Sequence, residues 1–450
     1  MAFFALSNNM STQGLLVAAG ALLVLLLLAD WARMLWMRRK LPPGPFPFPL
    51  VGNHFQTPIY KPWITWEKWA KYYDTTMLTI WIRRHPRIIP SDAWVASELL
   101  EKQSDIFSSR PHLVVMGDAI NCTNTNQTTL KYGDRWRLHR KLMAVRNYRP
   151  FQADESKVLI RDLLLDPDDF ELSIERYSVS TASIVGWGRR IDKKNDYVAQ
   201  QALKMMESEG STTKAGNFGK FMLKSQQKYE MTDVEVAGLM GNLIGGGVDT
   251  TSSTMIGCIL AMACFQDVQA KSHKEMDEVI GQERSPDWAD IDQGKLPYLA
   301  AIVKEVLRWR TVTVLAGIPH ANTKPVDYQG YHFPAGTNFT GNMWAIHRNP
   351  RDFPEPDEFR PERFLKGQER PYPNARGLDE EGREVKLDIF NYTESENTRP
   401  EAFKARFTSR SEKIRELILS EATEAREALR IDDGETKVRM EDAVANPARA

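Results

Sequence analysis

Two long apolar stretches stand out in the pattern of hydrophobic and polar positions along the chain. Residues 14–29 form an unbroken apolar run, which is marginal for a membrane span because a span needs about 20 residues. The second stretch runs from Thr232 to Phe265 and predicts a helix of about nine turns, roughly 50 Å long. Glu235 follows Thr232 by three residues, a capping pattern that satisfies free N–H groups at a helix start. A helix of that length crosses a whole domain, so we expect it to be central.

The rest of the pattern predicts a mainly α-helical fold with a small β side domain. An amphipathic helix is expected at residues 62–73, and strand-like pieces follow at residues 77–82 and 86–90. Short sheet pieces among many helices are typical of this class. The last helical stretch, residues 411–429, is strongly charged, so we expect a solvated surface helix there, with a partner-binding face as the alternative.

Three successive glycines, residues 245–247, stand in the middle of the central stretch and are followed by Asp249, Thr250 and Thr251. A glycine costs about 1 kcal/mol against alanine in a helix interior, so the run needs a reason. Missing side chains allow a flat, bulky group to lie against the backbone, beside the acid and the hydroxyls. The alternative is a buried helix with a glycine kink, whose hydroxyls bond back to the helix's own carbonyl groups.

The amino-terminal apolar run predicts an uncleaved, single-span membrane anchor. A cleaved signal peptide would carry positive charge before the run, yet residues 1–13 contain no Lys or Arg, while Arg33, Arg38, Arg39 and Lys40 follow it. This charge bias places the carboxyl-terminal side in the cytosol. A signal peptide and a buried amino-terminal helix remain alternatives. Residues 41–50, with five prolines, are then either a stiff spacer or a hinge.

The composition limits the classes of partner molecule that the chain is expected to bind. The 450-residue chain has a formal net charge of zero and a pI of about 7.1, so nothing in the overall balance indicates nucleic acid or an anionic surface as a partner. Its three cysteines, Cys122, Cys258 and Cys264, have no paired or metal-ligand spacing, as expected of a chain that folds in a reducing compartment.

Two polar pairs have helical spacing. Trp136 and Arg140 lie one turn apart in a basic stretch, which is either a solvated basic face or a pair of donors directed at a carboxylate. Glu305 and Arg308 lie three apart on a predicted helix and share a face, usually as an exposed ion pair. Arg363 lies farther along the chain, where it could join that pair.

Five features occur in a fixed order along nearly the whole chain. They are the apolar anchor with the sequence LPPGP, Trp136 with Arg140, residues 246–250 (GGVDT), Glu305 with Arg308, and residues 361–364 (PERF). In this order the chain resembles the cytochrome P450 superfamily, the haem-thiolate monooxygenases, and looks like a fungal member anchored in the endoplasmic reticulum. The resemblance implies the cytochrome P450 fold, preceded by one transmembrane helix.

The resemblance also implies a haem cofactor and roles for particular residues. Thr250 would steer protons to bound dioxygen, and Asp249 would connect that hydroxyl to solvent. Gly246 and Gly247 would let the haem lie close to the helix backbone. The haem propionates would be held by Trp136, Arg140 and His320. For His320, an ordinary surface-loop histidine is the alternative.

Further expectations follow from the family. Glu305, Arg308 and Arg363 would form a buried structural network beneath the haem. The substrate would be a lipophilic small molecule, with fungal secondary metabolism as one option, and electrons would come from an NADPH-dependent reductase. Residues 1–40 would anchor the protein as a single-pass chain in the endoplasmic reticulum membrane, residues 41–50 would be the hinge, and residues 51–450 would form the cytosolic catalytic domain.

The chain departs from the family at its most specific element. A haem-thiolate enzyme carries its axial cysteine after the PERF motif, but no cysteine follows Phe364 here. Cys258 and Cys264 lie on or just after the central helix, which in the family crosses the opposite haem face, and Cys122 lies in a substrate-side loop. None can simply replace the missing ligand, so the metal site lacks its expected residue.

Three seams suggest that blocks are absent from inside the chain. The helix after Trp136 stops at Met143, residues 202–208 lead into a stretch without room for two lid helices, and the approach to the ligand loop passes at Gly377 directly into the carboxyl-terminal tail. Three hypotheses follow from these seams: a monooxygenase by descent, a catalytically inactive or mispredicted member without the axial cysteine, and a non-catalytic, membrane-anchored interaction protein.

Overall fold

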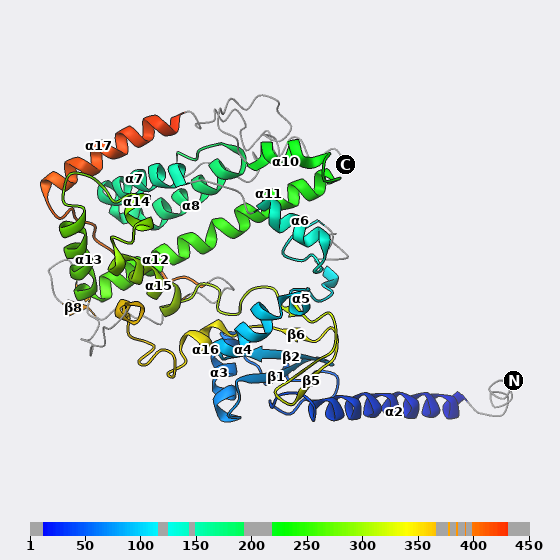
Figure 1. Cartoon of the computed structure of the whole chain (residues 1–450). Coiled ribbons are helices and arrows are strands. Elements are labelled where there is room, and N and C mark those ends of the chain that lie inside the picture. Colours follow the sequence, from blue (N-terminus) through cyan, green and yellow to red (C-terminus); the bar gives the residue numbers. More distant parts are fainter. Residues whose placement is uncertain are drawn as a thin grey trace. The chain divides into compact units, whose positions relative to one another are not determined.

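The structure is a computed structural model that describes residues 12–115, 125–143, 149–192, 218–365, 377–378, 384–385, 392 and 398–430. Figure 1 shows helices as the prevailing elements, accompanied by small sheets. The mainly α-helical class with a small β portion is therefore confirmed. Two compact units are distinguished: residues 1–111 with 315–346, and residues 112–314 with 347–450. Each is described by itself.

The first unit combines the amino-terminal helix with a small sheet. Its elements are α2 (Thr12–Arg38), α3 (Pro62–Tyr72), β1 (Met77–Ile82), β2 (His85–Pro90), α4 (Ala93–Ala96), the π-helical turn η1 (Ser97–Lys102), α5 (Ser104–Phe107), β3 (His320–Ala321), β4 (Val326–Tyr328), β5 (Tyr331–Phe333), β6 (Asn338–Phe339) and α16 (Met343–His347). The first three elements after the Pro-rich segment lie where the sequence predicts them, within one residue.

The four-stranded sheet of this unit has the order β1-β2-β6-β3. Strands β1 and β2 form an antiparallel hairpin that pairs Met77 with Pro90, whereas β6 pairs with β2 in parallel and with β3 in antiparallel fashion. Strand β1 reads MLTIWI, and its first five residues are buried, because one face packs on α3 and the other on α2 and α5. The core around Trp81 therefore includes Met34 of α2, which is fully buried.

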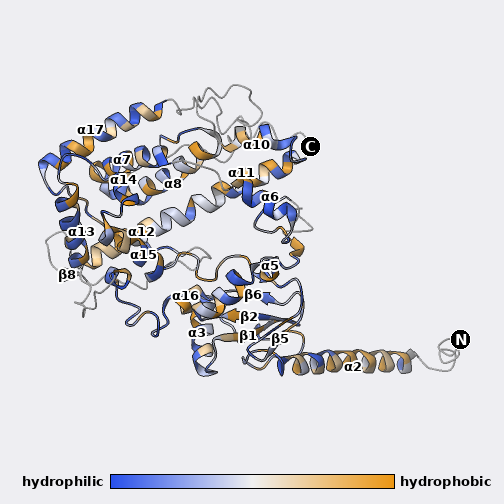
Figure 2. Cartoon of the chain, in the orientation of Figure 1, coloured by the Kyte–Doolittle hydropathy of each residue, from blue (hydrophilic) through white to orange (hydrophobic). Residues whose placement is uncertain are grey.

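One straight helix among the described residues is long and apolar enough to cross a membrane. It spans Gln13–Arg38 with a mean hydropathy of 2.4, and Figure 2 colours it as hydrophobic along most of its length. This is compatible with the predicted anchor.

The second unit is helical. Its elements are α6 (Asp134–Met143), α7 (Arg149–Leu165), the short η3 (Pro167–Asp169), α8 (Phe170–Trp187), α10 (Phe218–Gln226), α11 (Asp233–Gly247), α12 (Asp249–Cys264), α13 (Gln266–Val279), α14 (Trp288–Asp292), α15 (Pro297–Trp309), η4 (Pro361–Phe364), β7 (Gly377–Leu378), β8 (Glu384–Val385) and α17 (Glu412–Leu429). A core of Leu260, Phe265, Trp309 and Phe359 joins α12, α13 and α15.

The central helix differs from the prediction in one respect. It is divided into α11 and α12 at Val248, directly after the three glycines, although the backbone of Val248 keeps helical dihedral angles. The predicted start is correct: Thr232 and Glu235 exchange hydrogen bonds of 2.9 Å and 3.2 Å between side chain and backbone. Glycine and the hydroxyl-bearing residues that follow weaken the regular backbone ladder at this point, which accounts for the interruption.

The carboxyl-terminal helix α17 is less solvated than its charge predicts. Ser411 caps it by accepting a hydrogen bond from the Ile414 amide, and Ala422, Ala425 and Leu429 are buried. The last two belong to the same core cluster as Val158 of α7. Small residues on one face allow the close approach of two helices, so a charged sequence still packs against the unit.

Candidate active site

The start of α12 brings together the glycines, the acid and the hydroxyl that the sequence singles out. The Thr250 hydroxyl donates a 2.6 Å hydrogen bond to the carbonyl oxygen of Gly246, four residues earlier. Its proton is thus directed at the helix backbone, while the oxygen retains lone pairs that can accept a further bond. Asp249 is exposed to solvent. This arrangement combines both sequence interpretations of the stretch, a hydroxyl bonded back to the helix and an accessible acid beside it.

The glycines leave open space beside the helix. A Cβ atom added at Gly245 or at Gly246 would meet no atom within 4 Å, and one added at Gly247 would lie 3.6 Å from Ala182. Among the described residues, no neighbouring atom therefore excludes a side chain at Gly245 or Gly246. The open surface is what a flat ligand lying against the backbone would require.

A pocket of about 410 Å³ lies along α12 and contains Thr250 in its wall. It is lined by Thr250, Thr251, Thr254 and Met255 of α12, by Leu307 of α15 and by residues 310–313. Five threonines and one arginine give this wall many hydrogen-bonding groups, whereas Met255, Leu307 and Val312 are apolar. The volume is that of a small-molecule site.

Arg310 is the charged residue of the pocket wall, and no motif in the sequence marks it. Its side chain is only 3% exposed, donates 2.8 Å to the carbonyl oxygen of Trp309 and lies 3.5 Å from Asp357. Burial lowers the pKa of Arg310 to about 10. Its signal in the sequence is a second arginine two residues after Arg308.

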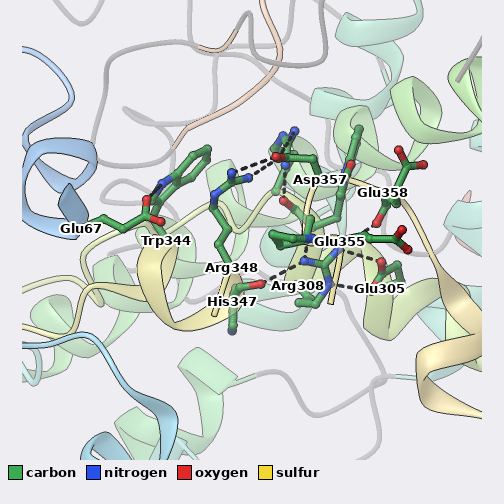
Figure 3. Close-up of polar contacts among 12 residues, drawn as sticks. Glu67, Glu305, Arg308, Trp344, His347, Arg348, Glu355, Asp357 and Glu358 are labelled. Atoms are coloured by element: carbon green, nitrogen blue, oxygen red, sulfur yellow. Dashed lines mark hydrogen bonds and ion pairs between the residues drawn. The ribbon is translucent and has the colours of Figure 1, made fainter. Parts of the chain in front are cut away.

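Glu305 and Arg308 form a buried pair, rather than an exposed one. Arg308 donates to both Glu305 oxygens at 2.7 Å, and Figure 3 shows its guanidinium also directed at the backbone of His347. The amide of Arg360 donates a further 2.7 Å bond to Glu305, and the Arg363 guanidinium lies 3.4 Å away. The structure thus brings together the three residues of the expected network, in the interior of one unit.

Trp136 and Arg140 lie together on α6. The Arg140 guanidinium is 5.7 Å from the centre of the Trp136 ring, in cation–π contact, and Arg140 is exposed. Arg135, on the adjacent face, makes two 2.6 Å bonds to Glu235 of α11. The basic stretch therefore has two roles: Arg135 attaches α6 to α11, and Arg140 is exposed and accessible to a ligand.

His320 lies in strand β3 of the first unit. Its Nδ1 is 2.8 Å from the carbonyl oxygen of Phe107, and burial, reinforced by Arg110, lowers its pKa. The neutral His320 ring therefore contacts the backbone carbonyl group of Phe107. A role toward haem propionates remains a prediction for His320, as it does for Trp136 and Arg140.

The described cysteines do not fit an axial thiolate ligand. Both lie in α12, where burial raises the pKa of Cys258 and of Cys264 to about 11, so each thiol keeps its proton near neutral pH. Coordination to a metal can itself displace a thiol proton, so it is the position of these thiols in α12, and not their protonation, that separates them from the expected ligand. Cys122 lies outside the described residues, as do residues 144–148, 202–217 and 372–376, on which the three predicted seams fall in whole or in part. The glycine surface and the pocket leave room for a flat cofactor, but no cysteine among the described residues lies outside α12.

Comparisons with known proteins identify the class. The Cytochrome P450 family model matches residues 42–159 and 185–377. Cytochrome P450 monooxygenase 105 of Postia placenta is 30% identical over 392 residues, covering 73% of this chain and 74% of that protein. Cytochrome P450 monooxygenase criE of Aspergillus cristatus is 30% identical over 394 residues, covering 74% and 73%.

The fold comparison agrees. A zebra fish cytochrome P450 structure with progesterone has a TM-score of 0.59 and 21% identity, covering 68% of this chain and 84% of that one. A second structure of a zebra fish cytochrome P450, with abiraterone, has a TM-score of 0.56 at the same identity. Fold and sequence together define a haem-protein architecture of the monooxygenase type. The chain belongs to the cytochrome P450 family, as the order of its motifs predicts.

Proposed function

We propose that the ancestral activity of this chain is the haem-dependent insertion of one oxygen atom into a lipophilic small molecule. Electrons would come from an NADPH-dependent reductase, and the reaction would take place on the cytosolic side of the endoplasmic reticulum membrane. The family and the apolar helix α2 support this assignment. The Thr250 hydroxyl and the exposed Asp249 would hold and move protons at the α12 pocket. The two relatives are named for monooxygenase activity, which supports the reaction type but not a particular substrate.

We further propose that the chain in its present form is catalytically inactive. The observation that carries this is the set of available ligands: no cysteine follows Cys264 in the sequence, and both cysteines among the described residues lie within α12. Without a thiolate, electron density cannot be donated to the iron for cleavage of the O–O bond. The open glycine surface and the network around Glu305 would then be retained structure, without turnover.

The alignments support a loss of internal segments. The match to the Postia protein runs over 392 residues, yet 73% of 450 residues is only about 330 residues of this chain. About sixty positions of that alignment therefore lie opposite gaps. The family match also ends at residue 377, where the ligand loop is expected to be absent. Val303 and Leu307 of α15, which are 56% and 53% exposed, form the kind of apolar face that a lost covering segment would leave.

Carbon monoxide difference spectroscopy tests the inactive state. The full chain is expressed with a haem precursor, solubilised in detergent, reduced and exposed to carbon monoxide, with the Postia relative as a positive control. We expect the relative to give the band of a thiolate-ligated haem and this chain to give none. A thiolate-type band from this chain would refute the proposal.

Sequencing the transcript across residues 143, 208 and 377 tests the ancestral activity. Extra coding sequence at 377 with a cysteine, in a protein that gives the carbon monoxide band, would support a monooxygenase of which this chain is an incomplete version. A transcript identical to this chain would restrict the activity to its ancestors.

A further inference from the structure

The wall of the α12 pocket contains one charged side chain among polar and apolar neighbours. The residues that line this pocket of about 410 Å³ all belong to the second unit. Arg310 is the ionisable residue among them, and within the described part of the chain no carboxylate lines the pocket. A cation that faces a cavity without an acid in its wall favours an anionic ligand over a neutral or cationic one.

Arg310 is held in place by the residues around it. Its guanidinium donates the 2.8 Å bond to the carbonyl oxygen of Trp309 and lies 4.4 Å from the centre of the Trp309 ring. The indole N–H of Trp309 in turn donates a 2.6 Å bond to the carbonyl oxygen of Asp357, and Trp309 is 2% exposed. The guanidinium is therefore already ordered, and it would lose little side-chain entropy when a ligand binds to it.

The charge around Arg310 is positive. The carboxylate of Asp357 lies 3.5 Å from the Arg310 guanidinium, but Arg348 donates hydrogen bonds to both oxygens of the same carboxylate. One acid therefore faces two arginines, while the neighbouring Arg308 is balanced by Glu305. Although burial lowers the pKa of Arg310 to about 10, the group remains charged at neutral pH.

The hydroxyl groups of α12 favour one orientation of an anionic ligand. Thr250 and Thr254 donate their hydroxyl protons to carbonyl oxygens of the same helix, at 2.6 Å and 2.7 Å. Because these protons are used within the helix, we expect a bound carboxylate near Arg310 and not beside these two threonines. The apolar side chains of the wall, which can contact the rest of the ligand, are Met255, Leu307 and Val312.

We propose that the α12 pocket of this chain binds a small carboxylate with an apolar body. Arg310 binds the carboxylate through its planar fork of N–H donors, which matches the two carboxylate oxygens. Met255 and Leu307 contact the apolar body. This binding requires neither haem nor turnover, so it can be tested whatever the outcome for the proposed function.

Equilibrium dialysis of the full chain tests the site. The chain is expressed without a haem precursor, solubilised in an uncharged maltoside detergent and dialysed against radiolabelled benzoate, with the same detergent in both chambers. Benzamide, which has the same ring and a neutral head group, is the competitor. We expect benzoate to bind and benzamide to compete at least about tenfold less well, because only the carboxylate forms charge-assisted bonds with Arg310. No binding of benzoate, or equal competition by benzamide, would overturn the proposal.

Removal of the guanidinium tests the residue to which the binding is assigned. R310M keeps a long, unbranched side chain without donors or charge, and its melting curve shows whether it folds. We expect folded R310M to bind benzoate at least about tenfold more weakly than the original chain. R310K, which keeps the charge but not the planar fork, should lie between the two. A folded R310M that binds benzoate as tightly as the original chain would show that Arg310 does not recognise the carboxylate.

A second pair of variants decides the question if R310M does not fold. Thr251 lines the same pocket and is exposed, so its substitution leaves the core intact. T251E adds a carboxylate that competes for Arg310 and repels the ligand, whereas T251Q adds the same bulk without the charge. We expect T251E to bind benzoate at least about fivefold more weakly than T251Q. Equal binding by these two variants would contradict recognition of an anion in this pocket.

Discussion

The buried pair of Glu305 and Arg308 allows a quantitative prediction for R308A. The substitution removes two 2.7 Å bonds to a carboxylate that is 0% exposed, together with bonds to the carbonyl oxygens of His347 and Pro356 at 3.0 Å and 2.9 Å. Removing one partner of a buried ion pair lowers the free energy of unfolding by about 3–5 kcal/mol. The Arg360 amide and the Arg363 guanidinium still face the carboxylate, so we expect about 3 kcal/mol, at the lower end of that range.

The assay is urea unfolding of the detergent-solubilised chain, followed by tryptophan fluorescence. A loss of about 3 kcal/mol lowers the folding equilibrium constant by about a hundredfold. R308K keeps the charge but not the planar fork, so its loss should be smaller. K274A breaks an exposed pair with a 3.8 Å separation and should cost under about 0.5 kcal/mol. If R308A costs no more than K274A, the burial argument is wrong.

Three further predictions concern other parts of the chain. Burial alone would raise the pKa of Glu235, but hydrogen bonds from Arg135 outweigh it and lower that pKa from 4.5 to about 2. The stability this gives is complete above pH 4.5 and is lost as pH falls toward 2, so E235Q should flatten the acid limb of a pH–stability curve. G44A should lower the melting temperature because of its clash with β1, whereas G20A, where a Cβ meets no atom within 4 Å, should not. The two α12 thiols, with pKa values near 11, should resist alkylation at pH 8 in native protein and react after denaturation.

Local elements could be predicted because their causes are local. Strand β1 and helix α3 are encoded by short apolar patterns, and the start of α11 by a capping pattern within four residues. The interruption at Val248 was expected only as the glycine-kink alternative, since apolar periodicity continues through it. The hydrophobic pattern indicates which residues of the helix are buried. It does not indicate where the backbone hydrogen bonds of the helix are interrupted.

The candidate site was predictable where its residues share one helix. Glu305 and Arg308 are neighbours on α15, so their pairing follows from their spacing, but its burial depends on the distant segment from 347 to 363. Arg135 pairs with Glu235, which lies 100 residues later in the sequence, and Arg84 pairs with Asp30, which lies 54 residues earlier. These ion-pair partners are brought together by tertiary packing, so the local sequence around each residue does not predict them.

The Glu305 network is made by side chains and backbone groups of the chain itself. None of its bonds involves the α12 pocket or a cysteine. These residues, by which the sequence resembles its family, therefore belong to the folded core of the second unit. A core of this kind indicates common ancestry and the ability to fold. Inferring the activity of a chain from its sequence similarity depends on the presence of the iron ligand.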